Sequence, residues 1–240
     1  MNYSFSEDGF EIAEDVLTPV QVELLREVIA SLSKRHRGGA RNLLSDSPAV
    51  AESAAAPPVK VLADSALGSE AFAVRALCFD KSSDANWKVP WHQDTAIAVA
   101  ERIETPGFVG WSVKDGVPHV HPPAEILEQM VALRVQIDDC GSDNGPLRVL
   151  PGSHRQGKLE SDEIERWKRR VTEVACNLNS GSVLMMRPLL LHASSPAQSP
   201  VHRRVIHFEY ACQALTGGLR WHVQQTQIAS TLCLNTLSLT

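Results

Sequence analysis

The sequence predicts a mainly β fold with flanking helices, and three kinds of local pattern carry this prediction. Residues 131–138 alternate between apolar and polar side chains, which is typical of a strand with one buried face. Residues 71–80 and 204–210 are further strand-like apolar runs. Asp143-Asn144-Gly145 is a strong reverse-turn signal, because asparagine and glycine tolerate positive φ, and it predicts a return to a strand at 147–150.

Length and composition favour one domain in a reducing compartment. A chain of 240 residues is long enough for a single large β domain. The net charge of −5 provides no basic field for nucleic acid. The N-terminus lacks a signal-peptide pattern and no run reaches membrane-spanning length, so we expect a cytoplasmic protein with no membrane partner. The odd number and wide spacing of the cysteines predict reduced thiols: Cys78, Cys140, Cys176, Cys212 and Cys233.

Two helices are predicted outside the strands. Thr18 is a good N-cap, Pro19 suits the first helical position and Gln21 completes a capping box, so a helix is expected over about 18–33. Its apolar stripe predicts packing on the outside of a sheet. A charged segment at 161–174 has helical apolar spacing and predicts a surface helix.

A candidate metal site begins at His92 and Asp94. They are two residues apart in a run that becomes apolar and β-branched, so on a strand continuing to about Val99 both side chains leave from one face. A second apolar run ends at His192. Two histidines and one carboxylate form the facial triad that binds Fe(II) and leaves coordination positions open.

His119 and His121 are a rival metal pair with the same spacing. They lie between prolines, in a segment over about 101–123 that is rich in glycine and proline. We expect this segment to be a lid-like loop that covers the pocket and helps to select the substrate, because long loops in compact domains are often lids. Trp111 and His119 are therefore candidate substrate contacts rather than ligands.

Two groups of basic residues could bind anions. An arginine can hold a carboxylate through two hydrogen bonds, and Arg203 or Arg204 could anchor a diacid in this way, although only one of two strand neighbours can point inward. Arg41 follows the basic, glycine-containing segment 34–39, which by itself predicts a solvated loop. It is also a candidate cation at the pocket mouth. Residues 45–58 predict a surface loop or weak helix.

The chain resembles the phytanoyl-CoA dioxygenases, a family of Fe(II)- and 2-oxoglutarate-dependent oxygenases that includes the ectoine hydroxylases. The matching pieces occur in the family's order over about the middle half of the chain. They are Trp91-His92-Gln93-Asp94, the turn from Asp143 to His154 with Pro151-Gly152-Ser153-His154, His192-Ala193-Ser194 and Arg203-Arg204. The resemblance places His154 in a turn near the site and not on the metal.

The resemblance implies a double-stranded β-helix, or jelly roll, with the site in its mouth. It implies that His92, Asp94 and His192 hold Fe(II), that 2-oxoglutarate chelates the metal, and that O2 takes the remaining position. The spacing from the distal histidine in the family selects Arg203 as the anchor of the far carboxylate.

The resemblance also implies further cosubstrate contacts. Ser194 matches a position that donates to the cosubstrate, although a simple turn serine is an equal alternative. Lys81 follows a predicted strand where relatives often carry a basic residue, and the alternative is a surface lysine. Arg134 falls where relatives place a cosubstrate-contacting side chain, an aromatic in some of them. Gln93 lies inside the metal motif and is a fourth candidate.

The expected function is oxidation of a small molecule. Relatives that halogenate replace the carboxylate ligand, so Asp94 favours hydroxylation, with release of succinate and CO2. Arg41, Lys81 and Arg134 favour an anionic or carboxylated substrate. A cupin-like metalloenzyme that does not use 2-oxoglutarate and a non-catalytic jelly-roll binding protein are the alternatives. The protein is expected to be a monomer or a homodimer.

Overall fold

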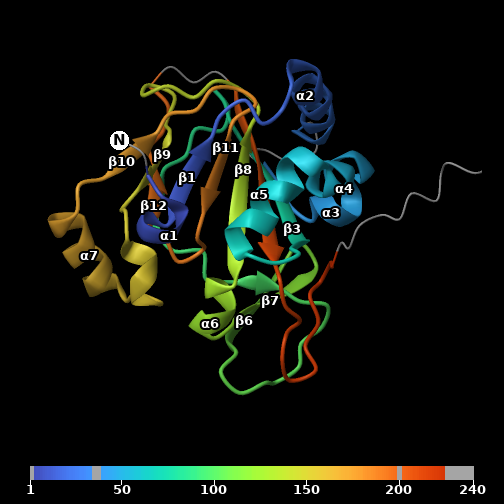
Figure 1. The fold of residues 1–240 in the computed structure, drawn as a ribbon, viewed down its shortest axis with the longest axis vertical. Helices are drawn as coiled ribbons and strands as arrows, with labels where there is room; N and C mark the ends of the chain where they lie inside the picture. Colours follow the sequence, from blue (N-terminus) through green and yellow to red (C-terminus); the bar gives the residue numbers. More distant parts are fainter. Residues whose placement is uncertain (1–2, 34–38, 199–201, 225–240) are drawn as a thin grey trace, which may run out of the picture.

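The fold is a jelly roll of two facing antiparallel sheets with helices on one outer face (Figure 1). A computed structural model describes residues 3–33, 39–198 and 202–224. The large sheet contains, in spatial order, β1 (Phe10–Ala13), β11 (Val183–Met186), β8 (Met130–Gln136), β13 (Arg203–Ala211), β3 (Phe72–Lys81) and β2 (Gly39–Ala40). The facing sheet contains β10 (Val174–Cys176), β9 (Leu147–Val149), β12 (His192–Ser194) and β4 (Val89–His92).

A smaller third sheet lies beside these two. It contains β5 (Ile97–Ala98), β7 (Val117–His121) and β6 (Val109–Lys114). The predicted strands at 71–80, 131–138, 147–150 and 204–210 therefore correspond to β3, β8, β9 and β13.

Side chains that alternate along the strands give the large sheet an apolar face, which packs in the core, and a polar face, which lines the site. On β13, Ile206, Phe208 and Tyr210 are buried in the main apolar core, which they share with residues of α2 (Pro19–Ser33), α4 (Pro48–Ala55) and α5 (Pro57–Leu67). The Tyr210 hydroxyl donates to the Ala54 carbonyl at 2.7 Å. The opposite faces of β13, β8 and β3 point between the two sheets and carry the polar side chains of the site.

The predicted helix start at Thr18 is confirmed. The Thr18 backbone N–H donates to Gln21 Oε1 at 2.9 Å, and the Gln21 N–H donates to Thr18 Oγ1 at 3.4 Å. The predicted surface helix is also present as α7 (Ser161–Arg170). The remaining helices are α1 (Phe5–Asp8), α3 (Leu43–Asp46), α6 (Ala124–Glu128) and the 3-10 helix η1 (Ser153–Gln156).

Of the two alternatives expected for residues 45–58, a surface loop or a weak helix, the structure has helices: Ser47 caps α4 by accepting from the Val50 N–H, and prolines begin α4 and α5. Two other expectations about local structure need correction. No single strand runs from 94 to 99, because β4 ends at His92 and the Asp94 N–H donates to the Pro188 carbonyl at 2.9 Å. Part of the expected loop 101–123 is the β6–β7 hairpin.

Two expectations from composition can be compared with the described residues. No helix among them is long and apolar enough to cross a membrane. Cys78, Cys140, Cys176 and Cys212 are free thiols, as predicted, while Cys233 lies outside the described residues.

Candidate metal centre and cosubstrate pocket

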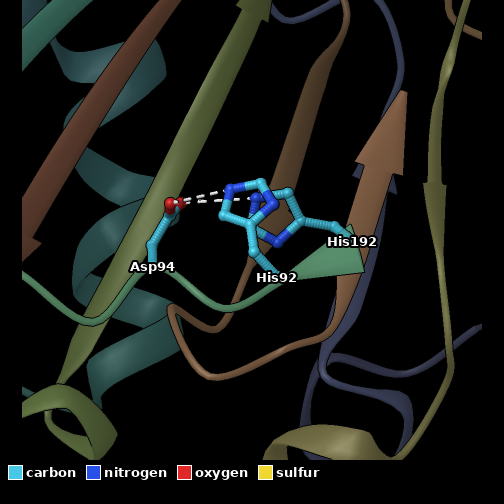
Figure 2. A group of neighbouring side chains, drawn as sticks. All are labelled: His92, Asp94 and His192. Carbon is cyan, nitrogen blue, oxygen red and sulfur yellow. Dashed lines mark ion pairs between the residues drawn. The ribbon is translucent and has the colours of Figure 1, made fainter. Parts of the chain in front are cut away.

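His92, Asp94 and His192 converge at one point between the sheets (Figure 2). Both histidine Nε2 atoms lie 3.5 Å from an oxygen of Asp94, and the ligand atoms all lie within 4.8 Å of one another. Within the described part of the chain this is the only group of three or more histidine, cysteine or acidic residues that could hold a metal ion. The rival pair His119 and His121 forms no such group there.

Backbone carbonyls fix both imidazole rings in the orientation that a metal requires. His92 Nδ1 lies 2.9 Å from the Pro90 carbonyl and His192 Nδ1 lies 2.8 Å from the Leu190 carbonyl. Since Nδ1 must donate to these oxygens, the lone pair of each neutral ring is on Nε2. Both lone pairs then point toward the space shared with Asp94.

The charge states of Asp94 and His192 also suit a divalent cation, whereas for His92 burial is outweighed by the hydrogen bond and charge of Asp94, which raise its pKa. Burial opposes charge on Asp94, but His192 and His92 outweigh this effect and hold the pKa of the carboxyl well below its usual range. Burial lowers the pKa of His192 to about 4, against the attraction of Asp94. One anionic and one neutral ligand are thus ready at neutral pH without loss of a proton. The donor set fits Fe(II), which two histidines and one carboxylate bind with positions left open.

A cavity of about 320 Å³ surrounds the triad. Its wall is the inner face of the large sheet, where side chains at alternate positions of β3 and β13 point inward. The lining of the whole cavity includes six lysines and arginines but only two carboxylates: Arg41, Arg75, Lys81, Lys114, Arg134 and Arg203, with Asp94 and Glu209.

Lys81 and Arg203 form a buried pair of cations at one end of this wall. They are direct cross-strand partners in β3 and β13, with exposed fractions of 0% and 4%. Lys81 Nζ donates to Ser194 Oγ and to the Ser195 carbonyl, both at 2.6 Å. Arg203 Nη1 donates to the Gly145 carbonyl, and its buried Nε has no hydrogen-bond partner among the described residues. Neither cation has an ion pair within the described residues, so this end of the cavity fits an anion.

The electrostatic effect of this pairing is visible in Lys81. Burial, together with the charge of Arg203, lowers the pKa of Lys81 to about 8. The alternative of a surface lysine is therefore wrong, because a solvated strand-end lysine would experience neither effect.

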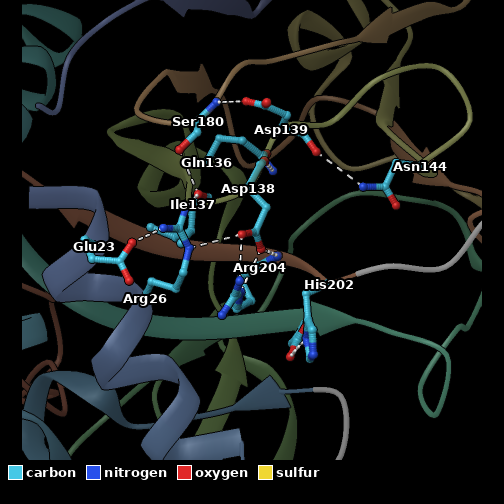
Figure 3. Close-up of polar contacts among 11 residues, drawn as sticks. Glu23, Arg26, Gln136, Ile137, Asp138, Asp139, Asn144, Ser180, His202 and Arg204 are labelled. Atoms are coloured by element: carbon cyan, nitrogen blue, oxygen red, sulfur yellow. Dashed lines mark hydrogen bonds and ion pairs between the residues drawn. The ribbon is translucent and has the colours of Figure 1, made fainter. Parts of the chain in front are cut away.

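Arg204 points to the opposite face and is excluded as the anchor. Its Nε and Nη2 each lie 2.7 Å from an oxygen of Asp138, which also lies near Arg26 of α2 (Figure 3). Asp138 lies beyond the end of β8 and holds this outer arginine.

Arg134 and Gln93 have different relationships to the cavity. Arg134 lines it, donates from Nη1 to His207 Nδ1 at 3.2 Å and lies over the Phe79 ring. Gln93 also lines it, but its amide nitrogen donates to the Gly157 and Leu189 carbonyls and its oxygen accepts from the Leu159 N–H. The amide of Gln93 is thus used in holding the backbone around the metal motif.

The structure does not bring Trp111 or His119 to the cavity. Trp111 packs against a separate apolar cluster, and Arg102 lies over its ring. His119 is buried, with an exposed fraction of 1%, and is not among the residues that line the cavity. Side chains of β7 alternate in direction, so His121 lines the cavity and His119 does not. Arg41 does line the cavity, and its Nε lies 3.4 Å from Asp115 at the hairpin tip.

Sequence reasoning missed four charged or titratable residues of the cavity: Arg75, Lys114, His207 and Glu209. Three of them carried a usable signal. Arg75 is six residues from Lys81, and His207 and Glu209 are four and six residues from Arg203, so the period of two places them on the same inward faces. Lys114 gave no comparable signal because its position depends on how the hairpin folds over the barrel.

The fold and the triad together define a jelly-roll metalloprotein of the two-histidine, one-carboxylate type. The sequence profile of phytanoyl-CoA dioxygenase (PhyH) matches residues 5–205, and the chain belongs to this family. This chain is 24% identical to L-proline trans-4-hydroxylase of Streptomyces griseoviridis over 180 aligned residues. The alignment covers 64% of this chain and 59% of that protein.

Solved structures with the same fold include EctD from S. alaskensis, crystallised with 2-oxoglutarate and 5-hydroxyectoine. It is 22% identical with a TM-score of 0.67, covering 87% of this chain and 73% of EctD. AviO1 from Streptomyces viridochromogenes Tue57 is also 22% identical, with a TM-score of 0.63 over 86% of this chain and 91% of AviO1. This similarity extends the fold assignment to nearly the whole described chain.

Proposed function

We propose that this protein is an Fe(II)- and 2-oxoglutarate-dependent oxygenase that hydroxylates a small molecule. The observation that carries the proposal is the combination of a preformed triad with two adjacent buried cations, Lys81 and Arg203, that have no ion pair among the described residues. Buried cations without counter-charges destabilise a fold, so an anionic ligand at this position explains their presence. Family membership and the hydroxylase relative support the same activity.

In this proposal His92, Asp94 and His192 hold Fe(II), and Arg203, Lys81 and Ser194 bind the far carboxylate of 2-oxoglutarate. Arg203 contributes its unpartnered Nε and Lys81 contributes charge, while Ser194 orients the ammonium group. When bound, the iron supplies a coupled oxidation in which 2-oxoglutarate yields succinate and CO2, and O2 contributes one oxygen atom to succinate and one to the substrate. The protein holds both reactants against the metal and limits access of water.

The two alternatives explain less of the site. A cupin-like enzyme without 2-oxoglutarate, or a binding protein without turnover, would leave the Lys81 and Arg203 pair without a ligand. Arg134 is assigned to the same side of the cavity, where its hydrogen bond to His207 fixes the guanidinium near the cosubstrate. Gln93 is assigned a positioning role, because its amide is occupied by backbone groups.

The cavity supports a small anionic substrate. Its volume of about 320 Å³ is at the lower end of the range for ligand pockets. Cations exceed carboxylates in its lining, and Arg41 stands at its mouth. The β6–β7 hairpin serves as the lid. Its tip is held to the opposite side by the ion pair of Asp115 with Arg41 and by the Asn42 amide, which donates to the Asp115 carbonyl at 3.3 Å.

The proposal is tested by reconstituting the protein with Fe(II) and measuring succinate formed from 2-oxoglutarate in air. We expect succinate release that requires Fe(II) and increases with a substrate from a panel of small carboxylates. Asp94→Ala removes a metal ligand and is expected to abolish it. Binding of both Fe(II) and 2-oxoglutarate with no succinate formed under any condition would show a binding protein rather than an oxygenase.

A further inference from the structure

Lys114 is a cation inside the cavity that the proposed machinery does not use. It is the last residue of β6 and lines the cavity from the hairpin side. Its side chain has no hydrogen bond or ion pair with any residue in the described part of the chain. An ammonium group that is half-buried beside a metal centre is suited to hold an anion.

Arg75 faces Lys114 from the large sheet. Arg75 Nη1 donates to Glu209 Oε1 at 3.0 Å, and the two side chains are 12% and 8% exposed. This pair joins direct cross-strand partners in β3 and β13. Glu209 therefore orients the guanidinium, whose other nitrogens have no further partner among the described residues. A guanidinium fixed in this way retains donors for a second carboxylate.

The two cation pairs lie at opposite ends of one wall. Arg75 is six residues from Lys81 on β3, and Glu209 is six residues from Arg203 on β13. Six residues of strand span about 20 Å at roughly 3.3 Å per residue. Asp94 contributes to the cavity lining together with His207, which lies between the two ends of β13. The cosubstrate's carboxylates are assigned to the metal and to the Arg203 end, so the Arg75 end faces the remaining space.

The electrostatics of this second end also favour an anion. Burial lowers the pKa of Lys114, and the charges of Arg75 and Arg41 lower it further. Arg41 is ion-paired with Asp115 and Arg75 with Glu209, so of these three cations only Lys114 has no carboxylate partner among the described residues. A bound anion would relieve this repulsion.

We infer that Lys114 and Arg75 form a subsite for a carboxylate group of the substrate, at the end of the cavity opposite the cosubstrate anchor. The inference rests on the proposed function for the metal and cosubstrate roles. Arg75 binds one carboxylate oxygen through its free donors and Lys114 binds the other. A small carboxylic acid held there presents carbon atoms near its carboxylate to the metal, and a neutral amide of the same shape is discriminated against.

The test compares L-proline and cyclopentanecarboxylate with their amides as probes. Binding is measured by calorimetry on the Zn(II)-loaded protein with saturating 2-oxoglutarate, so that no turnover occurs. We expect each acid to bind at least about tenfold more tightly than its amide, which is the size of one charge-assisted hydrogen bond. Lys114→Met is expected to reduce this preference, because only Arg75 then binds the carboxylate, and Lys114→Arg is expected to retain it. Lys88→Met is the matched control, because Lys88 is exposed and outside the cavity lining.

The outcomes separate this inference from the proposed function. Equal binding of acids and amides, no binding of either acid, or an unchanged preference in Lys114→Met would overturn the subsite. The affinity of each variant for 2-oxoglutarate is measured in the same experiment and is expected to match that of the unmodified protein. Failure of 2-oxoglutarate to bind the unmodified protein would instead contradict the proposed function.

Discussion

His92 and His192 are direct cross-strand partners in β4 and β12, with ring centroids 4.2 Å apart. The register of one strand pair therefore places two ligands side by side, although exactly one hundred residues of sequence separate them. Asp94 joins them after the strand has ended, held by the bond of its N–H to the Pro188 carbonyl. The backbone thus brings the three ligands of the triad together.

Exchange of Arg203 for methionine tests which arginine anchors the cosubstrate. This variant loses the charge-assisted hydrogen bonds to the cosubstrate, which contribute about 1.5–3 kcal/mol to the binding free energy. The Kd for 2-oxoglutarate is therefore expected to rise about 10- to 100-fold. Arg204→Met is the matched control, since it removes the outer pair with Asp138 and is expected to lower stability while leaving this Kd unchanged. Calorimetric titration of both variants decides the assignment, and equal losses of affinity would contradict it.

The lowered pKa of Lys81 predicts how the stability of the protein and its affinity for 2-oxoglutarate change with pH. Because burial lowers its pKa to about 8, the unfolded chain binds more protons than the folded chain above that pH. The stability of the cosubstrate-free protein is therefore expected to gain a contribution as pH rises from about 8 toward 10.5, its ordinary pKa. Affinity for 2-oxoglutarate is expected to fall as the ammonium loses its proton.

Denaturant unfolding and 2-oxoglutarate titration at a series of pH values measure both effects. Lys81→Met is expected to remove both pH dependences and to weaken cosubstrate binding throughout. Lys88→Met is expected to behave as the unmodified protein. If the pH dependence of 2-oxoglutarate binding persisted unchanged in Lys81→Met, another group would be responsible.

Gly145 links the predicted reverse turn to the anchor. Its φ is +62°, an added Cβ would lie 2.5 Å from the Ser195 carbonyl oxygen, and its own carbonyl accepts from Arg203. Gly145→Ala is expected to lower the free energy of unfolding by about 3 kcal/mol or more and to weaken 2-oxoglutarate binding. Gly116→Ala has a similar φ of +80° with no atom within 4 Å, so it is expected to lose about 1 kcal/mol and no affinity. Thermal unfolding and calorimetry compare the two, and similar losses in both would exclude the close contact as the cause.

Much of the fold could be predicted because period-two patterns reveal strands and their buried faces. The alternation at 131–138 placed Leu133 and Val135 on a buried face, and both lie in the core. The family resemblance implied that Arg134 contacts the cosubstrate, and Arg134 lines the cavity. The helices after residue 43 were harder to predict, because short alanine- and proline-rich segments gain helical stability from packing on the sheet rather than from their own propensity.

The candidate site was predicted where it depends on motifs and missed where it depends on tertiary folding. The triad residues meet as expected, although Asp94 reaches the site from a loop and not from a continuous strand. Lys114 could not be located, because a hairpin that folds over the barrel leaves no local signal of which side chain faces inward. Trp111 was assigned wrongly for the same reason.

The most direct measurement is an anaerobic titration of the metal-free protein with Fe(II) and then 2-oxoglutarate, following the visible charge-transfer absorption of a metal-chelated 2-oxo acid. We expect this absorption to appear in the unmodified protein and in His121→Ala, and to be absent in His192→Ala. Its absence from the unmodified protein, or its persistence in His192→Ala with loss in His121→Ala, would contradict the assignment of the metal centre.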